Sequence, residues 1–176
     1  MSQNNNPRVL IKTQPGNILL ELYPHQAPVT VRNFLRYIAE NRFQEATFHR
    51  TVRMDNQPNN VYKIEVIQGG LRDDDHPLSL PPIPHETTRQ TGILHTNGTL
   101  SMARKEPGTA SSDFFICIGD QPELDFEGRH NPDGQGFAAF GKVLDGMDVV
   151  HKIHDSPANG QTLEPSIPIQ RIINVD

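Results

Sequence analysis

The sequence predicts a mainly β fold: a closed, eight-stranded antiparallel barrel capped by two α-helices. Short apolar or alternating runs recur along the chain, turn-rich stretches separate them, and only two segments have helical periodicity. The 176 residues include 15 prolines and 13 glycines, which indicates many turns rather than disorder. A closed sheet would leave no edge strand exposed, although the periodicity by itself fits a β-sandwich equally well.

The first two strands are expected at 8–12 and 17–22, joined through Pro15 and Gly16. A proline followed by a glycine suits a type II turn, because proline sets φ and glycine accepts a positive φ. These two segments therefore predict a hairpin. Short apolar or alternating runs predict the later strands at 46–50, 63–68, 100–104, 113–118, 137–143 and 167–175.

The first of the two helices follows the hairpin. Apolar residues recur at i, i+3, i+4 and i+7 from Val31 to Ile38, with polar residues on the opposite face. Pro28 suits a first helical turn, where its missing N–H does no harm, and the helix is expected to end near Asn41. The second helix is expected over 147–154.

Composition limits the function classes. A net charge of −5 provides no basic surface for nucleic acid or anionic membranes, so neither is expected as a partner. No apolar run approaches the roughly 20 residues that a membrane-spanning helix needs. The N-terminus lacks the features of a secretory signal, so a cytoplasmic location is expected. Residues 1–6 are expected to be a disordered tail and 7–176 a single domain.

The potential metal ligands and nucleophiles are predicted to be structural. Cys117 is the only cysteine and lies in an apolar run, which excludes an internal disulfide and favours a buried thiol. His151 with His154, and the three aspartates at 73–75, lack the ligand spacing of zinc and calcium sites. Glu86 and His95 have no evident nucleophile beside them. No metal and no cofactor is therefore expected.

Five segments in a fixed order carry the more specific signal. They are Phe48-His49-Arg50, Ile67-Gln68-Gly69-Gly70, Gly98–Arg104, Asp113-Phe114-Phe115-Ile116 and Phe140-Gly141-Lys142-Val143. The series resembles the cyclophilins, whose hallmarks are an FHR strand, a QGG turn, an LSMA strand and an FFI strand. The resemblance runs from about Arg8 to the C-terminus and so covers nearly the whole chain.

The resemblance implies a barrel with a packed interior and a substrate groove on its outer surface. The activity that it implies is cis–trans isomerisation of X–Pro bonds in proline-containing peptides and in unfolded or partly folded proteins. Such an enzyme would assist protein folding. A monomer is expected because no interface-like apolar stripe remains once the barrel and the helices are assigned. The alternative is a proline-peptide-binding module with weak or no isomerase activity.

Site residues follow by matching motif positions. The resemblance assigns Arg50 as the catalytic residue, with Gln68 positioning it or the substrate and His49 lining the groove. The other substrate-binding residues that it implies fall into a proline pocket, a strand along the substrate backbone and one groove position: Val66, Phe115, Leu124 and Phe137; Met102, Ala103 and Arg104; and Asp113.

These residue types suit the reaction. A peptide bond resists rotation by about 18–20 kcal/mol because the nitrogen lone pair is delocalised into the carbonyl group. Uncatalysed X–Pro isomerisation takes roughly tens to hundreds of seconds. A guanidinium beside the imide nitrogen would stabilise the twisted state, in which that nitrogen accepts a hydrogen bond, more than either planar state. Apolar walls would hold the ring and exclude water.

Three positions depart from the best-known cyclophilins, all toward acidic residues. Glu65 aligns with an aromatic pocket residue, Asp113 with a glutamine and Glu123 with a tryptophan, while the segment 51–67 is longer than the shortest family form. If all three line the groove, two outcomes compete: a carboxylate pairs with Arg50 and lowers activity on neutral peptides, or the carboxylates stay solvated and favour substrates with Lys or Arg beside the X–Pro pair. The second is expected, because Gln68 is available to hold Arg50. The resemblance also implies weaker binding of cyclosporin, because a carboxylate replaces the indole.

Overall fold

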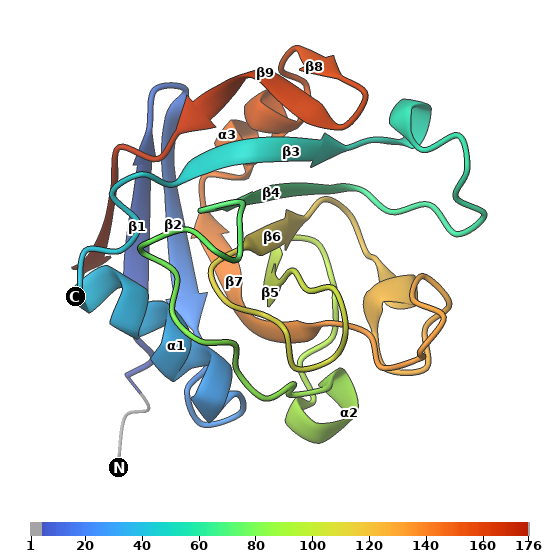
Figure 1. Cartoon of the computed structure of the whole chain (residues 1–176), viewed down its shortest axis with the longest axis horizontal. Helices are drawn as coiled ribbons and strands as arrows, with labels where there is room; N and C mark the ends of the chain where they lie inside the picture. The colour runs from blue at the N-terminus through green and yellow to red at the C-terminus, as the bar shows by residue number, and fades with distance from the viewer. Residues whose placement is uncertain (1–4, 176) are drawn as a thin grey trace.

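The computed structural model describes residues 5–175, and Figure 1 shows a curled antiparallel sheet with helices packed around it. Within these residues one sheet contains ten strands: β1 (Arg8–Thr13), β2 (Gly16–Leu22), β3 (Thr47–Val52), β4 (Val66–Gly70), β5 (Thr99–Met102), β6 (Phe114–Cys117), β7 (Ala138–Asp145), β8 (Ala158–Asn159), β9 (Thr162–Pro168) and β10 (Arg171–Val175). The helices are α1 (Pro28–Ala39), α2 (Thr88–Thr91) and α3 (Met147–His154), with 3₁₀ turns η1 (Met54–Asn56) and η2 (Pro122–Leu124).

The strand number differs from the expected eight. The strands follow the order β10-β1-β2-β7-β5-β6-β4-β3-β9-β8, and every pair is antiparallel. The run expected as one strand at 167–175 is split between β9, which pairs with β3, and β10, which pairs with β1. The short β8 was also not predicted, because two residues carry no periodicity.

The sheet curls into a barrel-type fold, but its hydrogen-bonded ladder is not closed. Within residues 5–175 no ladder joins β8 to β10, the two ends of the strand order. The segment that links β9 to β10, Ile169 and Gln170, crosses this gap. There the Ile169 N–H donates to the Ala46 carbonyl at 3.0 Å, and the Gln170 N–H donates to the Lys12 carbonyl at 2.8 Å.

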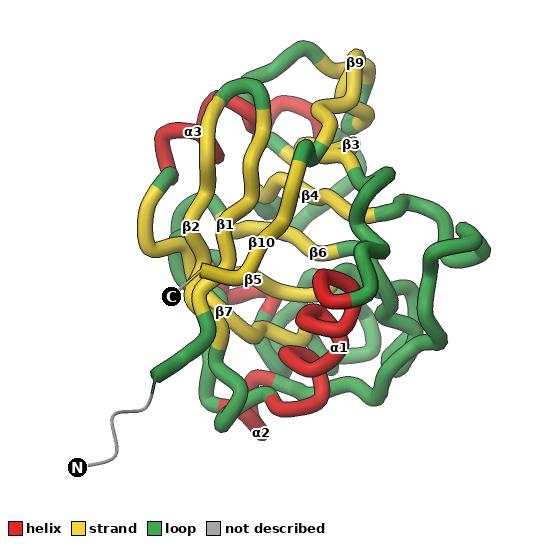
Figure 2. The backbone as a smooth tube through the Cα atoms, turned by 90° about the vertical axis from the view of Figure 1, so that its left-hand side faces the viewer, coloured by secondary structure: helices red, strands yellow, loops and turns green. Residues whose placement is uncertain are grey.

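The two expected helices are present, and a third was not predicted. Helix α1 ends at Ala39, close to the expected Asn41, and α3 covers the expected 147–154. The four-residue α2 is too short for a periodic signal; its N-cap Thr87 accepts a hydrogen bond from the Gln90 N–H. Figure 2 shows α1 and α3 toward opposite ends of the barrel. In residues 5–175 no helix is long and apolar enough to cross a membrane.

The main core fills the barrel beneath α1. Phe34 of α1 packs against aromatic rings at centroid distances of 5.4 Å from Phe43, 5.5 Å from Phe114 and 5.3 Å from Phe140. Cys117 is also buried, as the sequence predicts, with no disulfide partner. Burial raises the pKa of the Cys117 thiol strongly, so it remains protonated and unreactive.

Alternation along the strands creates a second, smaller cluster on the outer face of the barrel. In β6, Phe114 and Ile116 belong to the main core, whereas Phe115 and Cys117 face the other way. The outer cluster also contains Val52, Ile64, Val66 and Leu124. Because successive side chains point to opposite faces of a strand, the same four residues support both clusters.

The N-terminus of α1 is held by a carboxylate from a distant loop. Glu86 is 4% exposed, and its oxygens accept hydrogen bonds from the Thr30 N–H at 2.8 Å, the Thr30 hydroxyl at 2.6 Å and the Val29 N–H at 3.3 Å. Helix α1 has no side-chain N-cap of its own. The Glu86 carboxylate therefore accepts hydrogen bonds from N–H groups at the start of α1, and its negative charge interacts favourably with the positive end of the helix dipole.

We expect Glu86→Ala to lower the free energy of unfolding by about 2–3 kcal/mol, because buried N–H donors lose their charged acceptor. Glu86→Gln, which keeps one acceptor oxygen, should lose about half as much. Urea denaturation followed by circular dichroism measures both changes. Exposed Glu127→Ala is the control, and equal stability of Glu86→Ala and this control would contradict the capping role.

Candidate active site

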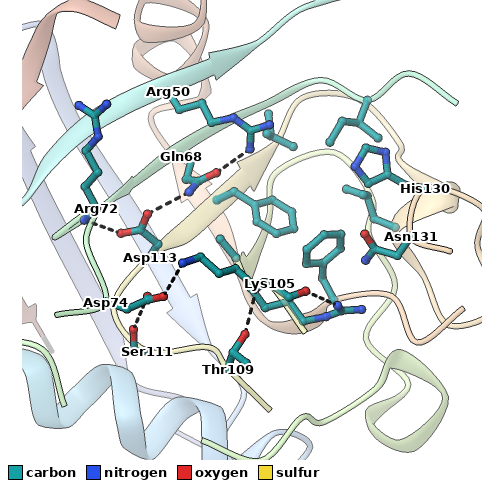
Figure 3. Close-up of a pocket in the computed structure, with 17 residues that line it drawn as sticks. Arg50, Gln68, Arg72, Asp74, Lys105, Thr109, Ser111, Asp113, His130 and Asn131 are labelled. Atoms are coloured by element: carbon teal, nitrogen blue, oxygen red, sulfur yellow. Dashed lines mark hydrogen bonds and ion pairs between the residues drawn. The ribbon is translucent and has the colours of Figure 1, made fainter. Parts of the chain in front are cut away.

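A cavity of about 300 Å³ opens on the outer face of β3, β4 and β6. Loops that follow these strands and β5 complete its two ends (Figure 3). The side chains that line it are Arg50, Ile64, Val66, Gln68, Arg72, Asp74, Ala103, Arg104, Lys105, Thr109, Ser111, Asp113, Phe115, Leu124, His130, Asn131 and Phe137.

The floor of the cavity is the outer apolar cluster. Phe115 meets Phe137 edge to face at a centroid distance of 5.2 Å. Behind Phe115 lies the ring of His95, stacked at 5.9 Å, whose nitrogens bond Asp125 at 2.7 Å and Ser101 at 2.8 Å. His95 is 1% exposed and thus supports the floor from behind, consistent with the structural role that the sequence predicts.

Arg50 extends from β3 along the polar edge of this floor. It is paired with Gln68 of β4 in the strand register, and its Nη1 donates to Gln68 Oε1 at 2.8 Å. Burial lowers the pKa of Arg50, while the charge of Asp113 opposes that shift. A guanidinium starts from so high a pKa that it stays charged at neutral pH.

A carboxylate continues this chain of hydrogen bonds behind Gln68. Asp113 Oδ2 accepts from Gln68 Nε2 at 2.9 Å and pairs with His49 Nε2 at 3.0 Å, and Oδ1 accepts from the Arg72 N–H at 2.9 Å. Burial alone would raise the pKa of Asp113, but the contacts with His49, Gln68 and the Arg72 N–H outweigh it and lower the pKa. Because an ionised carboxylate can only accept, Gln68 must turn its NH₂ to Asp113 and its oxygen to Arg50.

A glycine makes this close packing possible. Gly70 ends β4 directly beside Asp113, with φ of +139°. A Cβ at Gly70 would lie 2.7 Å from Asp113 Cα, a separation that real Cβ atoms essentially never show. The second glycine of the QGG segment is therefore required for Asp113 to reach Gln68.

The structure brings together nine of the eleven site residues expected from the sequence: Arg50, Val66, Gln68, Ala103, Arg104, Asp113, Phe115, Leu124 and Phe137. The other two do not line the cavity. His49 is 7% exposed and lies behind Asp113, while Met102 is 1% exposed and belongs to the main core. Strand alternation explains Met102, because its neighbour Ala103 takes the outward position.

Arg104 lines the cavity, but its guanidinium donors already bond to other protein groups. Its side chain is 2% exposed and ion-paired with Asp133 at 2.9 Å. The guanidinium also donates to the Gly136 carbonyl and lies 5.1 Å from the centroid of the Phe137 ring. Arg104 therefore fastens the 125–136 loop to β5 and holds the Phe137 wall in place.

The expectation of an acidic groove is wrong. Ile64, not Glu65, contributes to the apolar wall, whereas the Glu65 carboxylate lies 3.6 Å from His154. Glu123 forms an ion pair with Arg129 at 2.8 Å and is not among the cavity residues. Only Asp113 of the three acidic positions faces the cavity. Which residue of the 53–65 loop reaches the wall depends on how the loop folds over the barrel, and motif alignment could not place it.

Sequence reasoning also missed the two ends of the cavity. Figure 3 shows Arg72, Asp74 and Lys105 at one end and His130 and Asn131 at the other. All five come from turn-rich segments, where no periodicity indicates the direction of a side chain. The only signal in the sequence was that the 125–136 segment follows Leu124, a residue already assigned to the pocket.

We expect Asp113 to stabilise the fold in a pH-dependent way. Because its folded-state pKa lies below the ordinary 3.8, the stabilisation is complete above that value and is lost as the pH falls through the lowered pKa. At pH 5, the free energy of unfolding of Asp113→Asn should be about 1–3 kcal/mol lower than that of the unmodified protein. Urea titrations below pH 4 should show a smaller difference between the two free energies. A difference that stays constant to pH 2 would contradict this role.

Known proteins match this chain over nearly its whole length. The family model "Cyclophilin type peptidyl-prolyl cis-trans isomerase/CLD" matches residues 8–174. A peptidyl-prolyl cis-trans isomerase of Acinetobacter baylyi is 36% identical over 173 residues, which span 97% of this chain and 85% of the relative. Peptidyl-prolyl cis-trans isomerase B of Escherichia coli is 32% identical over 166 residues, 94% of each chain.

A solved structure supports the same assignment of the fold. The crystal structure of a cyclophilin type peptidyl-prolyl cis-trans isomerase from Cryptosporidium parvum superposes with a TM-score of 0.74 at 24% identity, covering 97% of this chain and 98% of that one. A second structure of that protein, in the presence of the dipeptide Ala-Pro, also gives a TM-score of 0.74. Since the family model and both relatives extend over nearly the whole sequence, the chain belongs to the cyclophilin-type peptidyl-prolyl cis–trans isomerases.

Proposed function

We propose that Arg50 carries the isomerase activity and that the substrate proline ring packs on Phe115. The observation that supports this proposal most directly is the position of a charged, immobilised guanidinium at the edge of an apolar floor. Such a floor favours a proline ring, and the guanidinium donors lie beside it. Proline-containing peptides are the substrates, in keeping with the Cryptosporidium parvum crystal structure obtained in the presence of the dipeptide Ala-Pro.

The proposed mechanism is differential binding of the twisted peptide bond. In the planar ground states the imide nitrogen is a poor hydrogen-bond acceptor, because its lone pair is delocalised. Twisting frees the lone pair, and an N–H of Arg50 stabilises it in this state alone. Phe115, Leu124 and Phe137 hold the ring while the acyl side rotates. No proton is transferred and no covalent bond is formed.

The finer biological setting is also proposed. We infer that the natural partners are unfolded or partly folded proteins, since the cavity is open and takes a short proline segment rather than a folded surface. The protein acts as a monomer, because its exposed large apolar side chains lie in separate segments: Met54, Val61 and Tyr62, then Leu94, then Leu144. The cytoplasm is the proposed compartment, as the sequence also predicts.

Arg50→Ala should lower kcat/KM by about 10²–10³-fold, because the stabilisation of the twisted state is lost. Arg50→Lys should recover only part of the activity, since an ammonium cannot reproduce the fork of donors. Isomerisation of a proline tetrapeptide measures both. Arg32→Ala, on the exposed face of α1, is the control.

Unchanged activity of Arg50→Ala would remove Arg50 from the mechanism. Undetectable isomerisation by the unmodified protein, together with binding of the tetrapeptide, would instead identify a proline-peptide-binding module. The two results are distinguishable because binding is measured separately by calorimetry.

The cavity end formed by Arg72, Asp74 and Lys105 predicts a preference among the substrate residues that flank the X–Pro pair. Arg72 is exposed and has no ion-pair partner in the described part of the chain, whereas Lys105 and Asp74 face each other at 3.3 Å. Peptides with Glu, Ala or Lys beside the X–Pro pair should therefore rank Glu > Ala > Lys in kcat/KM. Exposed pairs contribute only about 0.2–1 kcal/mol, so the differences are a few-fold.

Raising the salt from about 0.02 M to 0.5 M should compress this ranking, because salt screens exposed charges. Arg72→Gln should flatten it, and Arg171→Gln, on the distant strand β10, should not. A preference for Lys at low salt would contradict the charge distribution described here.

A further inference from the structure

We infer that Gln161 is a second positioning residue for Arg50, beside Gln68. The inference rests on the proposed function of Arg50, and it assigns to the β8–β9 turn a part in the reaction. Gln161 does not line the cavity, so it acts on the substrate only through the guanidinium.

The contact is a two-donor clasp on one edge of the guanidinium. Gln161 Oε1 accepts from Arg50 Nε at 3.0 Å and from Arg50 Nη2 at 2.7 Å. Gln68 Oε1 accepts from Nη1 at 2.8 Å. A guanidinium has five N–H donors, so these three bonds leave two N–H groups, on Nη1 and Nη2, without a partner in residues 5–175.

Two amides on different sides of the guanidinium constrain it more than one can. With Gln68 alone, Arg50 could rotate about a single hydrogen bond and still satisfy Nη1. The second acceptor fixes Nε and Nη2 at once, so the plane of the fork is defined by three contacts. The donors left over are those that the twisted imide nitrogen can use.

Gln161 can orient Arg50 because its own side chain and backbone are held by hydrogen bonds. Its Nε2 donates to the Asn56 carbonyl at 3.2 Å, and its own carbonyl accepts from the Thr51 N–H at 2.9 Å. A carbonyl can only accept, so the Gln161 NH₂ must face Asn56 and the Gln161 oxygen must face Arg50.

Asn56 in turn ties the β8–β9 turn to the start of the β3–β4 loop. Its Nδ2 donates to the Thr51 carbonyl at 2.9 Å and to the Gly160 carbonyl at 3.1 Å. Gly160 precedes Gln161 and has φ of +60°. The side chain that holds Arg50 is therefore carried on a tight turn that is braced from a neighbouring loop.

The variant Gln161→Leu removes the acceptor and keeps a similar volume. We expect its kcat to fall by about ten-fold, because the guanidinium loses two of the three hydrogen bonds that orient it, and its KM for a proline tetrapeptide to change by less than about two-fold. Gln161→Glu retains an acceptor for Arg50 but loses the donor to the Asn56 carbonyl, so its kcat should fall less than that of Gln161→Leu. Asn159→Ala, at the exposed position that precedes the same turn, is the matched control.

A double variant separates positioning from a general structural effect. In the Arg50→Ala background, Gln161→Leu should cause no further loss of kcat, because its target is gone. A ten-fold further loss there, a loss shared by Asn159→Ala, or an unchanged kcat in Gln161→Leu alone would overturn the inference. Should Gln161→Leu not fold, Gln161→Asn withdraws the acceptor by one methylene and is judged by the same criteria.

The experiment distinguishes the two proposals. If Arg50→Ala is impaired and Gln161→Leu is not, the proposed function stands and the role of Gln161 is overturned. If Arg50→Ala keeps full activity, the proposed role of Arg50 is overturned, and the role of Gln161, which acts only through Arg50, is overturned with it.

Discussion

Two packed clusters share the strands β4 and β6, and most of the site depends on this arrangement. Alternation sends Phe114 into the barrel, where α1 covers it, and Phe115 outward, where it becomes the floor of the cavity. The barrel core thereby fixes the strand that carries the floor. Since interiors are close-packed, a shift of one cluster would disturb the other through the strands that they share.

The polar edge of the cavity depends on a different constraint, the direction of hydrogen bonds. Asp113 can only accept, which sets the orientation of Gln68, and the Asn56 carbonyl can only accept, which sets the orientation of Gln161. Both amides consequently present oxygen to Arg50. A cation half-buried beside an apolar floor is costly to desolvate, and these acceptors, together with the charge of Asp113, offset the cost. The same contacts that stabilise Arg50 also orient it.

The ends of the cavity come from loops. The 53–65 loop supplies Ile64 to the wall, and the 125–136 loop supplies His130 and Asn131. These loops meet where the Arg129 guanidinium lies 4.2 Å from the centroid of the Tyr62 ring, and where His130 Nδ1 is 3.3 Å from the Tyr62 carbonyl oxygen. Arg50, Gln68 and Phe115 thus lie on strands, while the residues at the two ends of the cavity lie on loops.

The sequence was enough to predict the hairpin and both longer helices from local pattern, and to assign Arg50, Gln68 and Phe115 to the site from the motifs that resemble those of the cyclophilins. It was not enough for Glu65, Glu123 and Ile64, whose directions depend on how two long loops fold over the barrel. Nor could it find Gln161, which lies 111 positions from Arg50 in the chain and meets it only because β9 pairs with β3. Periodicity and short motifs encode local geometry and residue type. Long-range pairing and loop packing decided which side chains converge on the guanidinium, because those contacts arise from the fold of the whole chain.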